Sequence, residues 1–171
     1  MVLKTGRQGF AAKAGHDLTI EITRWSAQVQ VPGDDAGGIA AATVQAEFDL
    51  GSLEVREGTG GAKPLSDRDR AEIKKQMNSI LGTGTASFAS AKIVRFGSSG
   101  GAVEGTFTLN GQSEPVRLQV SEPQPGRYRG SATVVQSGLG IKPYTGFFGA
   151  LKLKDEVGVE FELSLPATDS A

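Results

Sequence analysis

Apolar and polar residues alternate with a period of two along much of this chain. Leu18, Ile20 and Ile22 occupy every second place between polar residues, and the same alternation recurs in residues 44–50 and 157–165. A period of two places successive side chains on opposite faces of a strand, so each run has one apolar and one polar face. The pattern therefore predicts half-buried antiparallel strands.

Turn residues between these runs indicate how the strands connect. Two alternating runs in 103–120 flank Asn110 and Gly111. Asn-Gly readily takes the positive φ angles of a type I′ turn, so this segment is predicted to be a β-hairpin. Two further strands are expected at 87–96 and 127–136.

A strand is also predicted at 25–31, where we expect it to pair back on residues 18–23. It begins at Trp25, the only tryptophan of the chain. Trp25 has two interpretations, a cover over a cavity mouth or simple packing in the core, and the pattern favours core packing.

Glycine is the compositional outlier, with 24 residues in a chain of 171. Several, such as Gly105 and Gly130, fall inside or beside the predicted strands. Glycine at such positions commonly marks bulges and sharp bends. These features let a sheet curve until it closes on itself, so the composition favours a barrel.

One segment breaks the two-residue period and predicts an amphipathic helix over 66–82. Ser66 is suited to cap it, acidic residues lie in its first turn, and Gly82 suits the position after its last turn. Its apolar residues fall on a single stripe. The stripe consists of Ile73, Met77, Ile80 and Leu81. A lone helix in an all-strand chain has to bury this stripe, and we expect it to lie over the open end of the barrel.

The rest of the chain indicates one domain. No shift in composition marks a second domain, so residues 1–166 are expected to form a single barrel. The glycine-rich stretch 56–64 is predicted to be a flexible loop, and residues 167–171 are predicted to be a disordered tail.

Charge and hydropathy argue against several classes of partner. The 18 basic and 19 acidic residues give a formal charge of −1, without a basic cluster. Nucleic-acid binding depends on clustered Lys and Arg, so we expect no nucleic-acid partner. The first residues lack the apolar core of a secretory signal, and no run approaches a membrane span. We therefore expect a cytoplasmic protein without an integral membrane segment.

Residues with catalytic or metal-binding chemistry are scarce. The chain has no cysteine, and His16 is its only histidine, so neither a His-based triad nor a zinc site is expected. We predict no catalytic residue, no metal and no cofactor. His16 is in phase with Leu18 and either points inward toward a ligand head group or, as the pattern favours, bonds to a neighbouring strand or Asp17. Glu160 and Glu162 are expected on the polar outer face.

The segment 143–152 neither alternates nor has a solvated composition. It contains Tyr144, Phe147, Phe148 and Leu151 beside glycines. Two interpretations stand equally: a lid over a cavity mouth, or a buried loop packed on the helix. Its surplus of apolar residues also gives a mild preference for a homodimer.

Taken in order, several runs together resemble YceI-like proteins: 15–21, the helix after a glycine-containing loop, 85–88, 107–116 and 155–161. The resemblance covers nearly the whole chain. It implies an all-β fold, an extended, lipocalin-like barrel of eight antiparallel strands with one amphipathic helix. It also implies that a polyisoprenoid or similar long-chain lipid binds along the interior.

We therefore expect a non-catalytic carrier or sequestering protein for an elongated apolar ligand. The alternatives are a structural or protein-interaction barrel without an internal ligand, as a monomer or a homodimer, and an enzyme acting on a lipid-like substrate. Strand parity supplies most of the candidate ligand-binding residues, and the two phenylalanines of 143–152 are candidates at the mouth. The candidates are Leu18, Ile20, Ile22, Phe48, Leu50, Phe107, Leu118, Val159 and Phe161, with Phe147 and Phe148 at the mouth.

Overall fold

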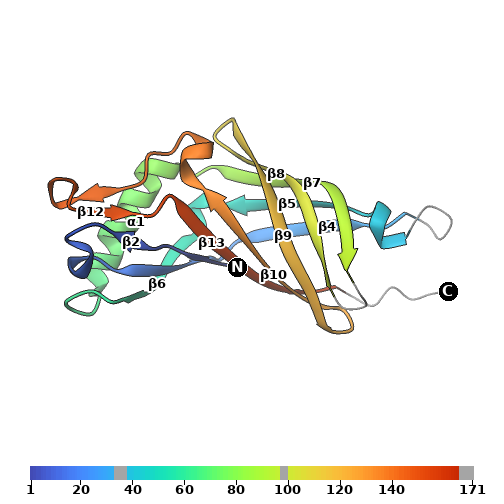
Figure 1. Cartoon of the computed structure of the whole chain (residues 1–171), viewed down its shortest axis with the longest axis horizontal. Helices are drawn as coiled ribbons and strands as arrows, with labels where there is room; N and C mark the ends of the chain where they lie inside the picture. The colour runs from blue at the N-terminus through green and yellow to red at the C-terminus, as the bar shows by residue number, and fades with distance from the viewer. Residues whose placement is uncertain (33–37, 97–99, 166–171) are drawn as a thin grey trace.

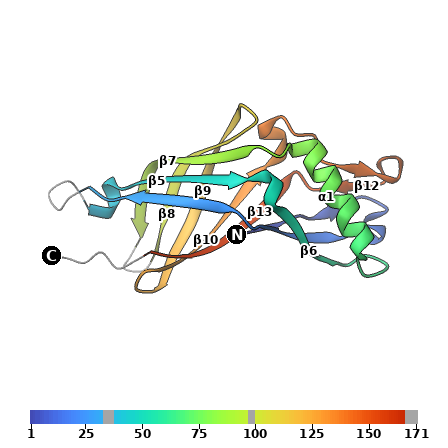
Figure 2. The same ribbon diagram turned by 180° about the vertical axis from the view of Figure 1, so that it is seen from behind.

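The computed structural model describes residues 1–32, 38–96 and 100–165. These residues form a large curled antiparallel sheet, a small second sheet and one α-helix (Figure 1). The helix, α1 (Asp67–Leu81), lies at the same end of the elongated molecule as the small sheet (Figure 2). The predicted tail, 167–171, lies outside the described residues.

The main sheet runs through ten strand segments, each hydrogen-bonded to the next. Their order is β4 (Trp25–Gln30), β5 (Thr43–Asp49), β7 (Thr85–Phe96), β8 (Gly100–Leu109), β9 (Gln112–Gln124), β10 (Arg127–Val135), β13 (Glu156–Ser164), β1 (Val2–Lys4), β3 (Asp17–Ile22) and β6 (Leu53–Thr59). The small sheet has the order β11 (Thr145–Gly146), β12 (Leu151–Leu153) and β2 (Arg7–Gln8). The short 3-10 helices are η1 (Ala12–Ala14), η2 (Gly38–Ala41), η3 (Leu50–Ser52), η4 (Gln136–Leu139) and η5 (Phe147–Gly149).

The ten segments differ from the eight predicted strands because two long strands are bent. Only residues 23 and 24 separate β3 from β4, and η3 alone separates β5 from β6. β3 pairs with β6 and β4 pairs with β5, so the four segments form one long bent hairpin. Counted as two strands, they bring the total to eight. The ring then closes, because β3 also pairs with β1 and β5 also pairs with β7.

Ser52 holds the two bends together. This buried side chain accepts a hydrogen bond from the Arg24 backbone N–H (3.0 Å) and donates to the Asp49 carbonyl (2.7 Å). Asp49 also accepts from the Arg24 guanidinium at 2.8 Å, and this bond holds the pKa of the carboxyl below its ordinary value. The polar groups freed by the interrupted ladder are therefore satisfied by one another.

The predicted pairing of 25–31 with 18–23 is wrong. β4 pairs with β5, from Trp25 opposite Phe48 to Gln30 opposite Thr43. The two segments continue one strand rather than folding back, which agrees with the missing turn signal between them.

The predicted hairpin at Asn110-Gly111 is confirmed. Leu109 pairs with Gln112, and the two residues between them have φ angles of 50° and 78°. The bulge expected at Gly105 is also found. Gly105 pairs with Ser90, and the β7–β8 register shifts between Ser90 and Lys92. A Cβ on Gly105 would lie 2.3 Å from the Ala89 carbonyl oxygen, so only glycine allows this close approach.

The helix is confirmed with its predicted caps. Ser66 and Asp69 form a capping box, in which the Ser66 hydroxyl accepts from the Asp69 backbone N–H (3.2 Å) and the Asp69 carboxylate accepts from the Ser66 backbone N–H (2.9 Å). Arg70 ties the helix to the barrel. Its guanidinium donates to the Arg56 carbonyl at 2.6 Å and to the Val55 carbonyl at 3.4 Å. These carbonyls belong to β6, an edge strand of the main sheet, so the helix covers an edge that would otherwise be open.

Candidate functional site

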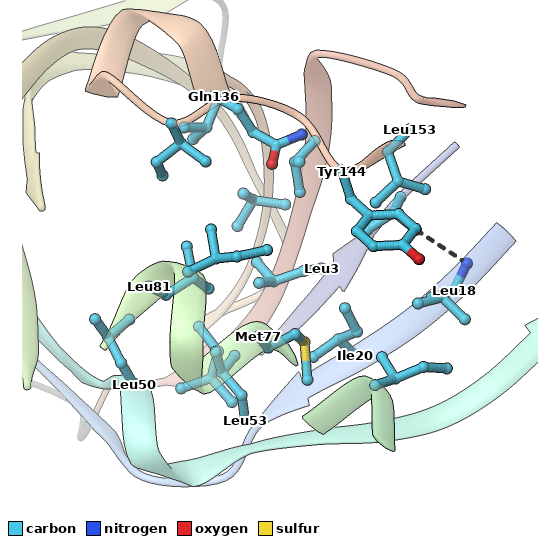
Figure 3. A pocket seen from close by; sticks show the side chains of 18 of the residues that line it. Leu3, Leu18, Ile20, Leu50, Leu53, Met77, Leu81, Gln136, Tyr144 and Leu153 are labelled. Carbon is cyan, nitrogen blue, oxygen red and sulfur yellow. Dashed lines mark hydrogen bonds between the residues drawn. The ribbon is translucent and has the colours of Figure 1, made fainter. Parts of the chain in front are cut away.

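The barrel encloses a cavity of about 770 Å³. Strand side chains form its wall, α1 lies across one end, and the loop 62–65 adds to the rim. Figure 3 shows Met77 and Leu81 from the helix facing Leu3 and Ile20 from the strands. The volume falls within the range of 300–1,000 Å³ that is typical of small-molecule sites.

Among the described residues, the strands of the main sheet contribute only apolar side chains to this wall. Phe48 lies at the centre of an aromatic group within it. Its ring is stacked on Trp25, with centroids 6.5 Å apart, and is tilted against Phe107 at 6.1 Å. Trp25 thus packs against the core, as its favoured interpretation predicted, and it also lines the cavity.

The structure places every predicted lining residue except Phe148 in the wall of the cavity. Those in the wall are Leu18, Ile20, Ile22, Phe48, Leu50, Phe107, Leu118, Phe147, Val159 and Phe161. Most of them lie there because one face of each strand turns inward. The Phe148 side chain is fully exposed outside the cavity.

Sequence reasoning also missed part of the wall. Phe88 and Ala86 line the cavity from β7. Phe88 lies in the predicted strand 87–96 and Ala86 directly before it, so the two-residue alternation identifies both as inward-facing. Leu53 and Leu139 gave no such signal, because each lies at a short 3-10 turn that interrupts the alternation. The helical stripe of Ile73, Met77, Ile80 and Leu81 lines the cavity as well. The prediction that the helix lies on the barrel end is therefore confirmed.

Polar lining groups come from outside the strands of the main sheet. They are Thr5, His16, Lys63, Asp69, Glu72, Gln76, Gln136 and Tyr144. Three of these lie on α1 and the others on segments that join the strands. The Ser66 hydroxyl donates to Asp69 at 2.6 Å and, with the Ser66 backbone N–H, holds the pKa of that carboxyl below its ordinary value. The polar groups of the wall, this carboxylate among them, therefore gather at the helix end of the cavity.

His16 and Arg7 fasten the rim. The His16 Nε2 lies 2.7 Å from the Lys63 carbonyl oxygen, so the imidazole bonds to the rim loop rather than to Asp17. A Cβ on Gly61 would lie 2.2 Å from the His16 Nε2, and one on Gly60 would lie 2.0 Å from the Arg7 guanidinium. The rigid imidazole ring leaves no room for a Cβ at Gly61, and the φ of 75° at Gly60 itself favours glycine.

The aromatic rings of the segment 143–152 lie exposed at the rim, whereas its Leu151 is buried. Tyr144 and Phe147 line the cavity, but the exposed fractions of Phe147 and Phe148 are 61% and 112%. The interpretation of a buried loop packed on the helix is therefore wrong for these two rings. Both residues have positive φ angles, 48° and 55°. Such angles cost a residue with a Cβ roughly 1–2 kcal/mol, so the turn carries strain.

Replacing Phe148 by glycine is expected to raise the free energy of unfolding by about 1 kcal/mol, because glycine takes positive φ without a Cβ clash. Alanine is the matched control, since Phe148→Ala removes the same ring but keeps the Cβ. Urea unfolding of both variants measures the difference. Equal stability of the two would show that this turn is unstrained.

The charged residues of the strands lie mainly on the outer surface. Glu162 pairs with Arg127 at 2.9 Å and with Arg129 at 3.5 Å, all three being well exposed. This agrees with the outward position predicted for it. Among the described residues, no cluster of three or more His, Cys, Asp or Glu is arranged to hold a metal ion. Within the same residues, no helix is long and apolar enough to cross a membrane.

Comparison with known proteins identifies relatives of this fold. The crystal structure of Burkholderia cenocepacia BcnA has a TM-score of 0.65 and 20% sequence identity, covering 96% of each chain. The Campylobacter jejuni YCEI protein has a TM-score of 0.52 and 11% identity, covering 88% of this chain and 85% of that one. A search of curated proteins finds no significant match. A family model for the YceI-like domain matches residues 4–165, so the chain belongs to the YceI-like family.

Proposed function

We propose that the protein binds one elongated apolar molecule, a polyisoprenoid or another long-chain lipid, inside its barrel. Its role is that of a carrier or sequestering protein, with no bond made or broken. The observation that carries this proposal is the division of the cavity wall. In the part of the chain that the structure describes, the strands of the main sheet supply only apolar side chains, and the polar groups belong to α1 and the connecting segments.

This division matches an amphiphile with a long tail and a small polar head. The tail lies along the strands, where no polar side chain competes for it. The head lies at the helix end, where Gln76, Gln136 and Tyr144 are hydrogen-bonding groups of the wall. Gln136 is held in place there, because its Nε2 donates to the Lys154 carbonyl at 2.9 Å.

The energetics favour retention of such a ligand. Burial of each methylene contributes about 0.8 kcal/mol, so ten buried carbons contribute roughly 8 kcal/mol. Loss of translational and rotational freedom opposes binding by about 4 kcal/mol or more. The chain belongs to the YceI-like family. The resemblance to this family implies a polyisoprenoid or similar lipid, so it supports the same class of ligand.

Protein purified without detergent is expected to carry a long-chain species in about equimolar amount. Native mass spectrometry of the intact protein and mass spectrometry of its organic extract measure the amount and identity of the ligand. An apo mass, together with no uptake of added isoprenoid or fatty acid, would contradict the proposal. That result would favour the alternative, a protein-interaction barrel without an internal ligand.

A further inference from the structure

Three phenylalanine rings project into solvent at the helix end of the barrel. The exposed fractions of Phe10, Phe147 and Phe148 are 106%, 61% and 112%. Phe10 follows β2, and the other two lie in the turn between β11 and β12. β2 pairs with β12, and the Ala11 backbone N–H donates to the Ala150 carbonyl at 3.0 Å, so the two turns lie side by side (Figure 1).

Folding does not account for these rings. None of the three belongs to the hydrophobic core or packs against it. Phe148 lies outside the cavity on a turn in which it and Phe147 have consecutive positive φ angles, which an L-residue adopts at a cost. An exposed aromatic group on a strained turn points to contact with something outside the chain.

The surroundings of the rings are positively charged. Residues 5–16, 58–65 and 140–154, which build this end, contain no Asp or Glu, although the whole chain has a formal charge of −1. Their lysines are all exposed, and none forms a salt bridge within the described part of the chain. These lysines are Lys13, Lys63, Lys142, Lys152 and Lys154.

The helix adds carboxylates nearby without cancelling this surface. Over its length α1 carries three carboxylates, Asp67, Asp69 and Glu72, against four basic residues, Arg68, Arg70, Lys74 and Lys75. The Asp69 carboxylate is bonded to Ser66 within the capping box. The lysine-rich turns around the phenylalanines therefore keep their positive charge.

We propose that this end of the barrel docks on the surface of an anionic lipid bilayer. Phe10 and Phe148 enter the boundary between head groups and acyl chains, and the surrounding lysines bind the anionic head groups. Aromatic rings and lysines are the side chains that hold a protein at such an interface. A second copy of this chain fits less well, because a symmetric contact would bring lysine turns against lysine turns.

Docking in this orientation sets the cavity mouth against the bilayer. Phe147 and Tyr144 belong both to the docking turns and to the cavity wall. A lipid then passes between the membrane and the barrel without crossing water. This transfer step rests on the proposed function, whereas the docking itself does not.

Co-sedimentation with vesicles tests the docking. The wild type is expected to bind vesicles containing phosphatidylglycerol and to bind pure phosphatidylcholine vesicles much more weakly, with a dependence on salt. Replacing Phe10 and Phe148 together by alanine is expected to weaken binding about a hundredfold, because two buried rings are lost. Tryptophan at both positions is expected to preserve binding. Val31→Ala, a truncation of an exposed apolar residue beyond the end of β4, is the matched control and is expected to change nothing.

Charge reversal tests the contribution of the lysines to docking. Lys13→Glu combined with Lys152→Glu is expected to weaken binding to the anionic vesicles by about tenfold or more. Native mass spectrometry of the same variants reports whether the cavity still holds its ligand, so failure of docking is distinguishable from failure of ligand binding. Wild-type protein that binds neither vesicle, or a double alanine variant that binds like wild type, would overturn the proposal. A wild-type dimer that becomes monomeric in the double alanine variant would overturn it in favour of a second copy.

Discussion

Replacing Ala46 and Ala132 together by phenylalanine is expected to abolish uptake of a long-chain ligand. Both alanines line the cavity, on β5 and β10. Three strands, β7, β8 and β9, separate β5 from β10 on one side of the ring. The bent strand β3–β4, β1 and β13 separate them on the other, so the two positions lie on opposite walls. Two added rings on opposite walls take up space that the tail would occupy.

The neighbouring outward positions supply the control for this variant. Gln45 directly precedes Ala46, and Thr133 directly follows Ala132. Both are exposed. Gln45→Phe with Thr133→Phe adds the same rings to the outer face and is expected to leave uptake unchanged. Native mass spectrometry after incubation with an isoprenoid alcohol measures bound ligand. Full uptake by the Ala46 and Ala132 double variant would place the ligand outside the barrel.

Replacing Leu53 by alanine is expected to lower the free energy of unfolding by about 2–5 kcal/mol. Leu53 is the most completely buried large side chain of the described residues, with an exposed fraction of 1%. Its truncation removes burial and leaves a void where the two bent strands meet. The expected loss is a large part of the 5–15 kcal/mol by which domains are stable.

Ile80 provides the comparison for Leu53. It carries the same number of carbon atoms, but its exposed fraction on α1 is 42%. Ile80→Ala is therefore expected to lower stability by less than about 1 kcal/mol. Urea unfolding followed by circular dichroism measures both variants. Similar losses for the two would show that the bend at Leu53 is not a packing centre of the barrel.

The local elements of this fold are predictable because their signals are local. The helix follows from a cap at Ser66, an apolar stripe and Gly82, which lie within 17 residues of one another. The hairpin follows from Asn110-Gly111, whose positive φ angles select one turn type. Strand parity likewise assigns Ile20 or Phe161 to the inner face without knowledge of any partner strand.

The bends in the long strands are decided by contacts between distant segments. Arg24 and Ser52 meet only after the hairpin has formed, and their hydrogen bonds replace the interrupted ladder. No residue near 23–24 has a turn signal, yet the two successive runs were predicted to fold back on each other, whereas the strand continues. Pairing between strands depends on the free energy of the whole closed ring, which a local pattern does not contain.

The sequence by itself determined the inward and outward faces of the strands, the helix with its caps, and the apolar character of the interior. These depend on periodicity and on turn chemistry within a few residues. Only the tertiary structure decided that the apolar faces enclose a cavity with polar groups at one end, and that Phe148 projects away from it beside Phe10. The physical reason is that a cavity is the space left between side chains of all eight strands and α1. Its size and mouth therefore depend on how distant segments pack, whereas the facing of each side chain depends on its own strand alone.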